Sequence, residues 1–210
     1  MIVVCTEYGS NYAGIAAITV PLMKEYCERH GYQFRELILE GTGNEYYYKK
    51  NEFFDELFKE GVEAIFYLDA DALITNLNIR VETFIDDEHS FFITEHIGEL
   101  NGGALIIKNN AGGVKINDFI LSEKCNFANE QNCINHYRYF PPFHNQMKVV
   151  DHPSFNSLNY ELYPELPHIR KREEGHWHEG DFVLHTPGLG IEHRKQILSE
   201  AKIIRWTITG

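Results

Sequence analysis

Short runs of consecutive apolar residues alternate with stretches of helical periodicity along the first third of the chain. The clearest run is Ile65-Phe66-Tyr67-Leu68, which passes directly into Asp69 and Asp71. An apolar run bounded by polar residues is typical of a strand buried on both faces of a sheet. Strands are likewise predicted at 2–6 and 32–39, and helices at 15–30 and 45–60. The first 76 residues therefore predict a β-α-β-α-β pattern, typical of a parallel sheet with helices on its faces.

A proline interrupts the first helical stretch. Pro21 lies among apolar positions that keep helical spacing from Ile15 to Cys27, before a stop at Gly31. Proline lacks the backbone N–H of a helix interior and is tolerated in a first turn. We therefore expect a second helical piece to begin at Pro21.

Beyond Asn76 the pattern loosens. The expected elements are a short helix or turn at 81–87, strands at 91–94 and 104–107, helices at 114–122 and 128–137, a strand at 180–185 and a terminal helix at 191–206. The stretch 140–170 is rich in Pro, Asn and aromatic residues, which predicts irregular structure around one or two short strands. The chain as a whole predicts an α/β fold with one domain over residues 1–210.

Charge and composition narrow the classes of partner. A formal net charge of −12 argues against nucleic-acid binding, which depends on Lys and Arg neutralising phosphates. No segment approaches the ~18 uncharged apolar residues of a membrane span. The four cysteines form no CxxC pair, and we interpret them as buried thiols in a reducing compartment. These features predict a soluble, cytoplasmic protein.

The acidic pair after the apolar run is the strongest candidate for chemistry. Asp69 and Asp71 follow the carboxyl end of a predicted strand, where open α/β sheets place their ligands. Two neighbouring carboxylates are electrostatically costly unless a cation relieves them, and oxygen ligands suit Mg²⁺ or Mn²⁺. The alternative is that both are turn-forming residues that cap the next segment. The apolar residues on either side, including Leu73 and Ile74, favour the functional interpretation.

Two other classes of protein stay open at this point. The string LDADALIT also resembles the strand of aspartyl-phosphate phosphatases, in which the first Asp is the nucleophile. A non-catalytic module that binds a nucleotide or a carbohydrate would need the same cavity without the turnover. Neither alternative is excluded by the residues alone.

Several segments together resemble the GT-A glycosyltransferases. They are FYLDADALITN, Tyr47-Tyr48-Lys49, the stretch from Leu100 to Ile107, Glu130-Gln131 and GDFVLHTPG. Their order resembles that in the yeast-type galactosyl- and mannosyltransferases and, more loosely, that in glycogenin-like enzymes. The chain is also similar to the glycosyltransferase domain encoded by a large chlorella virus. The resemblance extends from Ile2 to about Arg194.

This resemblance implies a fold and an activity. The fold is a central, mostly parallel mixed sheet flanked by helices. The implied activity is Mn²⁺- or Mg²⁺-dependent transfer of a hexosyl group from a nucleotide diphosphate sugar to a hydroxyl of a glycan or glycoprotein, and the expected donor is a UDP-sugar. Such an enzyme encoded by a virus would work in the host cytoplasm. The yeast-type relatives imply retention of the anomeric configuration, and an inverting carboxylate base among the 31 acidic residues stays an alternative.

The resemblance also implies roles for individual residues. Asp69, Asp71 and His185 match the metal ligands, and Asp71, Glu130 and Gln131 match catalytic positions, with Glu130 and Gln131 in a segment near the donor sugar. The implied donor contacts also include a lysine for the phosphates, matched by Lys49 with Lys50 as the alternative. The remaining implied donor contacts are Thr6, Tyr8, Tyr12, Asp69, Ala70, Asn101, Gly102, Gly103, Gly188 and Arg194. One departure is Gly102, where the family often has Thr or Ala.

Overall fold

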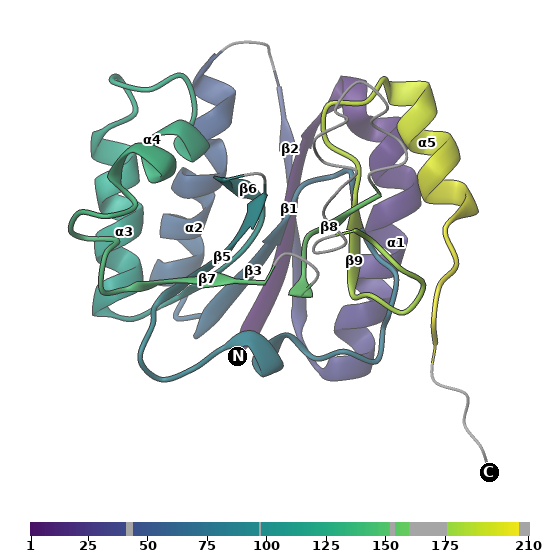
Figure 1. The fold of residues 1–210 in the computed structure, drawn as a ribbon, viewed down its shortest axis with the longest axis horizontal. Helices are drawn as coiled ribbons and strands as arrows, with labels where there is room; N and C mark the ends of the chain where they lie inside the picture. Colours follow the sequence, from purple (N-terminus) through teal and green to yellow (C-terminus); the bar gives the residue numbers. More distant parts are fainter. Residues whose placement is uncertain (41–43, 97, 152–153, 160–175, 206–210) are drawn as a thin grey trace.

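The computed structural model describes residues 1–40, 44–96, 98–151, 154–159 and 176–205 (Figure 1). Its strands and α-helices are β1 (Ile2–Gly9), α1 (Ala13–His30), β2 (Gln33–Leu39), α2 (Lys49–Lys59), β3 (Ala64–Leu68), β4 (Ala72–Ile74), β5 (Phe91–His96), β6 (Glu99–Lys108), α3 (Ala111–Ser122), α4 (Glu130–Tyr137), β7 (Met147–Val150), β8 (Ser157–Leu158), β9 (Val183–His185) and α5 (Ile191–Glu200). Short 3-10 helices are η1 (Ser10–Tyr12), η2 (Asn44–Tyr48) and η3 (Val81–Phe84). The predicted β-α-β-α-β order of the first part of the chain is confirmed.

Six strands form the large sheet in the order β2-β1-β3-β6-β5-β7. The pairs β1–β2, β1–β3 and β5–β7 are parallel, whereas β6 is antiparallel to both of its neighbours. Within the described residues β6 thus runs against the other strands of a sheet that is otherwise parallel. This is the mostly parallel mixed α/β sheet that the resemblance implies.

Alternate residues of the central strands point to opposite faces of this sheet. From β1, Val3 and Cys5 join the core under α2, α3 and α4, while Val4 joins the core on the side of α1. From β3, Ile65 and Phe66 divide in the same way. Figure 1 shows α2, α3 and α4 on one side of the sheet and α1 and α5 on the other. Because both faces are covered, the strands consist of nearly continuous apolar residues, as the sequence predicted.

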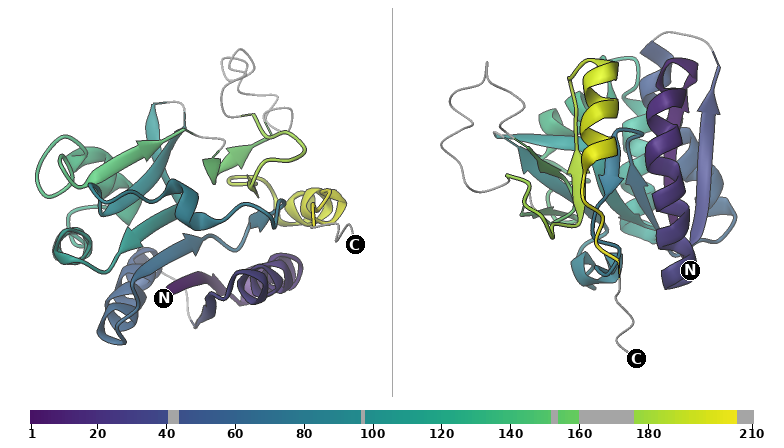
Figure 2. Two further views of the ribbon diagram at one scale, coloured as in Figure 1. Left: turned by 90° about the horizontal axis from the view of Figure 1, so that it is seen from below. Right: turned by 90° about the vertical axis from the view of Figure 1, so that its right-hand side faces the viewer.

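A second, small sheet places distant segments beside the end of β3. Its order is β4-β9-β8, with β4 and β9 antiparallel and Ala72 directly opposite His185. The two further views in Figure 2 show β9 and α5 side by side near the end of the chain. Since β4 follows β3 after only three residues, the pairing brings His185 close to the acidic pair.

Pro21 does not divide the first helix, contrary to the sequence prediction. α1 is continuous from Ala13 to His30, with Pro21 inside it. The Pro21 side chain lies on the exposed face, so the backbone carbonyl that loses its helical partner can be solvated by water. The helix ends where predicted, because Gly31 adopts a left-handed conformation with φ of 72°.

Two other helix boundaries differ from the prediction. The predicted helix at 45–60 begins as the 3-10 helix η2 and becomes α-helical only at Lys49. The terminal helix ends at Glu200 rather than at Trp206, because Ile204 exchanges backbone hydrogen bonds with Thr75 and Leu77. Trp206 itself, residues 41–43, and residues 152–153 and 160–170 of the stretch predicted to be irregular lie outside the described residues.

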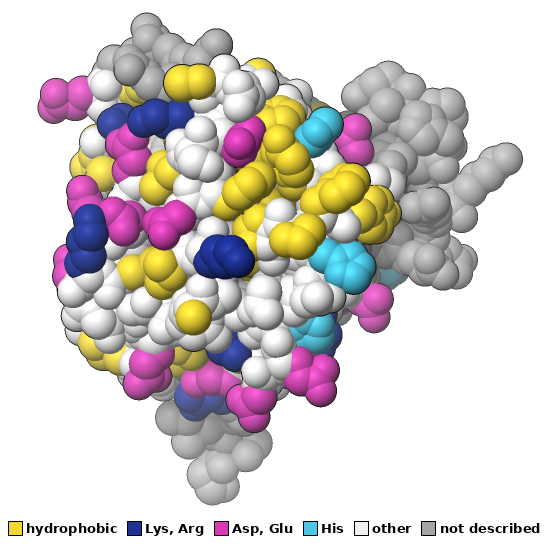
Figure 3. All heavy atoms as spheres, turned by 90° about the vertical axis from the view of Figure 1, so that its left-hand side faces the viewer, with side chains coloured by type: hydrophobic (Ala, Val, Ile, Leu, Met, Phe, Trp, Pro, Cys, Tyr) yellow, Lys and Arg dark blue, Asp and Glu magenta, His cyan; other side chains and the backbone are white. Residues whose placement is uncertain are grey.

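Some hydrophobic side chains are exposed on the surface. Figure 3 shows the face that lies on the left of Figure 1, where acidic and basic side chains surround a group of hydrophobic ones. Tyr139 and Phe140, directly after α4, are among the most exposed apolar side chains, at 69% and 59%.

All four cysteines are free, but Cys125 is exposed, which contradicts the prediction that all are buried. None of the described helices combines the length and the apolar character that a membrane crossing requires.

Candidate functional site

Asp69 and Asp71 occupy the turn between β3 and β4. The backbone of this turn is fixed on both sides, since Asp69 N donates to Gly103 O at 2.7 Å and Ala72 N donates to Asp69 O at 2.9 Å. The two carboxylates differ in exposure: the Asp69 side chain is 40% exposed and that of Asp71 is 6% exposed. One carboxylate therefore faces solvent in the cavity while the other lies behind it.

His185, at the end of β9, completes a group of three potential metal ligands. One ligand atom each from Asp69, Asp71 and His185 lies within 4.8 Å of the others, and we call these residues the Asp–Asp–His cluster. His185 Nε2 is 3.3 Å from Asp71 Oδ1 and 3.9 Å from Asp69 Oδ2. The imidazole is buried, and its Nε2 has no hydrogen-bond partner. A buried polar atom without a partner is costly, and a cation held between these three side chains would satisfy it.

The glycine of β6 next to this cluster leaves room for the ligands. A Cβ placed on Gly103 would lie 2.8 Å from Asp69 Oδ2 and 2.9 Å from His185 Nε2, closer than real Cβ atoms approach other atoms. Only glycine lets the backbone of β6 pass this close to the cluster. The three side chains thus fit a divalent cation both in their donor atoms and in the space around them.

Arg194 of α5 neutralises the inner carboxylate. Its Nη1 is 2.9 Å from Asp71 Oδ2 and also donates to the Tyr12 hydroxyl at 2.9 Å. Burial raises the pKa of Asp71, but the adjacent imidazole of His185 and the guanidinium of Arg194 outweigh that effect and hold the pKa below its usual value. Asp71 is therefore ionised at neutral pH, as a metal ligand must be.

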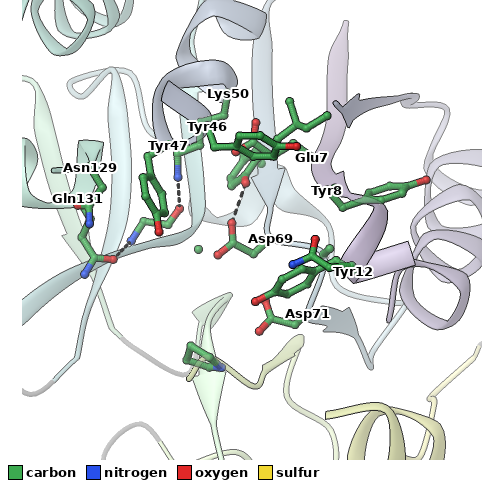
Figure 4. Close-up of a pocket in the computed structure, with 18 of the residues that line it drawn as sticks. Glu7, Tyr8, Tyr12, Tyr46, Tyr47, Lys50, Asp69, Asp71, Asn129 and Gln131 are labelled. Atoms are coloured by element: carbon green, nitrogen blue, oxygen red, sulfur yellow. Dashed lines mark hydrogen bonds between the residues drawn. The ribbon is translucent and has the colours of Figure 1, made fainter. Parts of the chain in front are cut away.

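These residues lie in a cavity of about 620 Å³. In Figure 4, Asp69 and Asp71 lie between Tyr12 on one side and Lys50 and Gln131 on the other. The residues that line the cavity are Glu7, Tyr8, Gly9, Ser10, Asn11, Tyr12, Leu39, Tyr46, Tyr47, Lys50, Tyr67, Asp69, Ala70, Asp71, Gly102, Gly103, Asn129, Glu130, Gln131, Pro187, Gly188 and Arg194. A cavity of this volume, bordered by aromatic rings and a few charged groups, is typical of a small-molecule site.

A second group of charged residues, which we call the lysine cluster, consists of Glu7, Lys50 and Glu130. Lys50 forms an ion pair with Glu130, and its Nζ donates to Gly102 O at 3.0 Å and lies 4.6 Å from the centre of the Tyr67 ring. Burial lowers the pKa of Lys50, but the surrounding carboxylates outweigh that effect and raise it. Lys50 is consequently a charged ammonium inside the protein.

Glu7 is the neutral member of this cluster. Burial raises its pKa to about 8, and the charges of Asp69 and Glu130 act in the same direction, whereas Lys50 opposes them. At pH 7 most Glu7 side chains are therefore protonated. A protonated carboxyl can donate a hydrogen bond into the cavity, which an ionised one cannot.

The structure brings together most of the residues that the sequence singled out. Eleven of them line the cavity: Tyr8, Tyr12, Asp69, Ala70, Asp71, Gly102, Gly103, Glu130, Gln131, Gly188 and Arg194. His185 lies behind the lining, in contact with the two acids. The left-handed backbone of Gly188, with φ of 75°, explains why glycine occupies that turn.

Three of the predicted donor contacts lie outside the lining. Thr6 is fully buried in β1, and the side-chain oxygen of Asn101 accepts a hydrogen bond from Gly103 N. Lys49 pairs with Glu52 at 2.7 Å, while the adjacent Lys50 lines the cavity. Their proposed contacts with a donor therefore stay predictions, and for the phosphate-binding lysine the placement favours Lys50.

Other lining residues were not singled out from the sequence as site residues. Tyr46 and Tyr47 come from η2, which precedes α2, and Tyr47 is 51% exposed. Glu7 follows an apolar strand, the same pattern that identified Asp69. A search for acids after every apolar strand would have found Glu7, whereas the tyrosines carry no comparable signal.

Comparison with known proteins places this geometry in context. Residues 6–90 match the model of the galactosyl transferase GMA12/MNN10 family. This segment includes the second half of β1 and the turn with Asp69 and Asp71, but it ends before His185. None of the curated proteins matches the chain.

Solved structures match over nearly the whole chain. A glycosyltransferase involved in the glycosylation of the major capsid of PBCV-1 has a TM-score of 0.74 at 19% identity, with 94% of this chain and 98% of that one covered. The galactosyltransferase LgtC, solved with donor and acceptor sugar analogs, has a TM-score of 0.55 at 13% identity, with 98% of each chain covered. GlyE of Streptococcus pneumoniae TIGR4 has a TM-score of 0.56 at 16% identity, with 98% of this chain and 62% of that one covered. The chain therefore has the GT-A glycosyltransferase fold and resembles the galactosyl transferase GMA12/MNN10 family in its first 90 residues.

Proposed function

We propose that the chain is a metal-dependent hexosyltransferase that uses a nucleotide diphosphate sugar, with a UDP-sugar as the donor. The acceptor would be a hydroxyl of a glycan or a glycoprotein. The observation that carries this proposal is the Asp–Asp–His cluster, with its unpartnered His185 Nε2, at a cavity of about 620 Å³. The family match and the fold support glycosyl transfer over the phosphatase alternative.

The donor atoms of the cluster favour a particular kind of ion. Asp69 and Asp71 offer oxygen, and His185 offers an imidazole nitrogen. Mg²⁺ prefers oxygen ligands, so the mixed set favours Mn²⁺ as the ion and leaves Mg²⁺ as the second choice. When bound, such an ion acts as a Lewis acid that stabilises negative charge on the departing diphosphate.

The side chains around the cluster would complete the site. Arg194 places a second positive charge near Asp71, where it could also meet a diphosphate. Gln131 accepts a hydrogen bond from Gly102 N at 2.9 Å, which leaves its amide N–H groups for the sugar. Tyr12 and Tyr47 present aromatic rings to the cavity, suited to a base or a sugar. We propose that these residues orient the donor and exclude water from it.

An incubation with a panel of nucleotide diphosphate sugars tests this function. We expect release of nucleoside diphosphate from a UDP-hexose in the presence of Mn²⁺ and a glycan acceptor, and none in the presence of a chelator. Analysis of the first product by NMR would then give the anomeric configuration, which the resemblance implies is retained. Release of phosphate from a phosphomonoester would instead identify a phosphatase, and donor binding without turnover would identify a binding module.

A further inference from the structure

A chain of hydrogen bonds lies behind His185, on the side of the imidazole that faces away from the two acids. It begins at the backbone N–H of Gly103, which donates to the side-chain oxygen of Asn101 at 2.9 Å. A backbone N–H can only donate, so the Asn101 atom that faces it must be the oxygen and not the amide nitrogen. The orientation of the Asn101 amide is thus determined by the backbone.

Asn156 continues this chain. Its side chain is fully buried between β6 and β9, and its Nδ2 donates to Asn101 Oδ1 at 3.0 Å and to Thr94 Oγ1 at 2.9 Å. Because Asn101 Oδ1 can only accept, the group that faces it must be the NH₂ of Asn156. A flipped Asn156 would place two oxygens against each other in a buried position, at a high cost in free energy. The oxygen of Asn156 must therefore point in the other direction, toward His185.

The last bond of the chain determines the protonation of the imidazole. His185 Nδ1 is 2.7 Å from Asn156 Oδ1, which can only accept. Nδ1 must accordingly carry a proton, and a neutral His185 then has a lone pair on Nε2. That lone pair faces Asp71 Oδ1 and Asp69 Oδ2, in agreement with the missing hydrogen-bond partner of Nε2.

We propose that Asn156, held by Asn101, is a positioning residue that keeps His185 in the Nδ1–H tautomer, with Nε2 available as a metal ligand. The inference rests on the metal site of the proposed function. The competing Nε2–H tautomer would donate to the Asp71 carboxylate and would leave no lone pair for a metal. Without Asn156 that tautomer is favoured, since Asp71 is the nearest acceptor to Nε2. Residues that orient a ligating histidine in this way typically contribute 10–100-fold to metal affinity.

The inference gives a second role to Asn101, which precedes Gly102 in β6. Asn101 was expected to meet the donor sugar, yet its side-chain oxygen takes part in the chain to His185. The β6 segment that borders the cavity is thereby coupled to the metal ligand. A change in Asn101 should affect the metal site as well as any sugar contact.

The tautomer can be measured directly by two-bond ¹⁵N–¹H correlation NMR on metal-free, ¹⁵N-labelled protein. The spectra are recorded above the titration of His185, and its signals are assigned by their loss in His185→Gln. We expect the Nδ1–H pattern in the wild type and in Asn156→Asp, whose carboxyl, protonated on the oxygen that faces Asn101 Oδ1, keeps both the donor for Asn101 and the acceptor for Nδ1–H. We expect a shift toward the Nε2–H pattern in Asn156→Leu, which has none.

Mn²⁺ affinity, followed by the EPR signal of the free ion, is the second measurement. Asn156→Leu should bind Mn²⁺ about 10–100-fold more weakly, and Asn156→Asp should recover most of that loss. Asn117→Leu is the matched control, because Asn117 is also a buried amide but is bonded to Asn51 of α2 rather than to His185. The control should lose stability without a change in the tautomer or in Mn²⁺ affinity.

The results separate this inference from the proposed function. An Nε2–H pattern in the wild type overturns the inference, and this result does not depend on any variant. Equal Mn²⁺ affinity of a folded Asn156→Leu and the wild type also overturns it, as does a wild type that binds no Mn²⁺. If Asn156→Leu does not fold, the patterns of the wild type and Asn156→Asp decide. An Nδ1–H pattern with Mn²⁺ binding, but without turnover of any donor, supports the inference and contradicts the proposed function.

Discussion

Two groups of charged side chains border the same cavity and differ in how their polar atoms are satisfied. In the lysine cluster, the ammonium of Lys50 lies inside the group and is bonded to Glu130 and to Gly102 O. In the Asp–Asp–His cluster, the ligand atoms face a common space, and His185 Nε2 has no hydrogen-bond partner. The first group contains its own cation, whereas the second is suited to receive one.

This difference separates a structural group from a binding site. A buried charge is tolerated when it is paired and hydrogen-bonded, which describes Lys50. A buried nitrogen without a hydrogen-bond partner, facing two carboxylates across a common space, is suited to a cation, which describes His185 Nε2 beside Asp69 and Asp71. Asp69 and Asp71 were visible in the sequence as an acidic pair, whereas Glu7, Lys50 and Glu130 of the lysine cluster lie far apart in it. Substitutions in each cluster should therefore have different consequences, one for stability and the other for metal binding.

The largest effect is expected from Asp69→Asn. At an effective dielectric of 20, two opposite unit charges 4 Å apart attract each other by about 4 kcal/mol. Losing the carboxylate charge of Asp69 would therefore weaken Mn²⁺ binding and transfer by about 1,000-fold. The side chain is 40% exposed, and asparagine keeps an oxygen for the Tyr67 hydroxyl that donates to Asp69 Oδ1. The fold should therefore survive. Mn²⁺ titration and donor turnover, with the melting temperature alongside, check this expectation.

Asp55→Asn provides the control for the loss of one carboxylate. Asp55 forms an exposed ion pair with Lys59 on α2 and does not line the cavity. Its replacement should leave Mn²⁺ affinity and turnover unchanged. If Asp69→Asn binds Mn²⁺ as tightly as the wild type, the Asp–Asp–His cluster does not hold the metal, and the two acids only form a turn.

A loss of stability is the expected result of Lys50→Met. Lys50 is 4% exposed, and its removal leaves Glu130 buried without its cation, a change that typically costs about 3–5 kcal/mol. The double variant Lys50→Met with Glu130→Gln should recover part of this loss, because no unpaired charge is then left behind. Denaturant unfolding of the single and double variants measures both quantities.

Mn²⁺ affinity distinguishes the two clusters in the same variants. Lys50→Met should change Mn²⁺ affinity only a few-fold, since Lys50 does not belong to the Asp–Asp–His cluster. A Lys50→Met protein of normal stability that fails to bind the donor would contradict the structural role. Lys50 would then be the phosphate-binding lysine that the resemblance implies.

Local sequence patterns were sufficient to predict the first half of the fold. The apolar run from Ile65 to Leu68 is a strand buried on both faces, because each face of the sheet is covered by helices. The short strands were harder to predict. β4 and β9 have three residues each, so their pairing depends on contacts between distant segments rather than on a periodic pattern.

The candidate site, too, could be predicted only where a local sequence pattern marks its residues. Asp69 and Asp71 were recognisable because two acids follow one strand, whereas His185 was implied only by the resemblance. Asn156 lies in a stretch predicted to be irregular, and no pattern connects it with His185. Glu7 has its raised pKa because the fold buries it and because the turn after β3 and the start of α4 bring the charges of Asp69 and Glu130 close to this residue of β1. A local pattern cannot express contacts that come from three separate elements.

A pH-dependent change in stability is expected from Glu7→Gln. The pKa of Glu7 is about 8 in the folded protein and close to the usual glutamate value of 4.5 when unfolded, so the folded state binds one more proton than the unfolded state between these pH values. The stability of the wild type should therefore fall as pH rises from 5 to 8, by on the order of 1 kcal/mol per pH unit at most. Glutamine keeps the neutral form and removes this slope.

The comparison of unfolding free energies at pH 5 and pH 8 tests this expectation. The advantage of Glu7→Gln over the wild type should be close to zero at pH 5 and should reach a few kcal/mol at pH 8. Exposed Glu88→Gln is the matched control. An equal difference between Glu7→Gln and the wild type at both pH values would show that Glu7 is ionised in the folded state.

The smallest effect is expected from Lys49→Ala. Lys49 and Glu52 form an i, i+3 pair with side chains 44% and 38% exposed, and such surface pairs contribute less than about 1 kcal/mol. Because Lys49 lies outside the cavity lining, its removal should change the KM for the donor less than about two-fold, a change of less than about 0.5 kcal/mol. Donor kinetics at constant Mn²⁺ measure this directly. A ten-fold higher KM with unchanged stability would instead show that Lys49 reaches the donor phosphates, which requires α2 or the Lys49 side chain to adopt a different position when the donor binds.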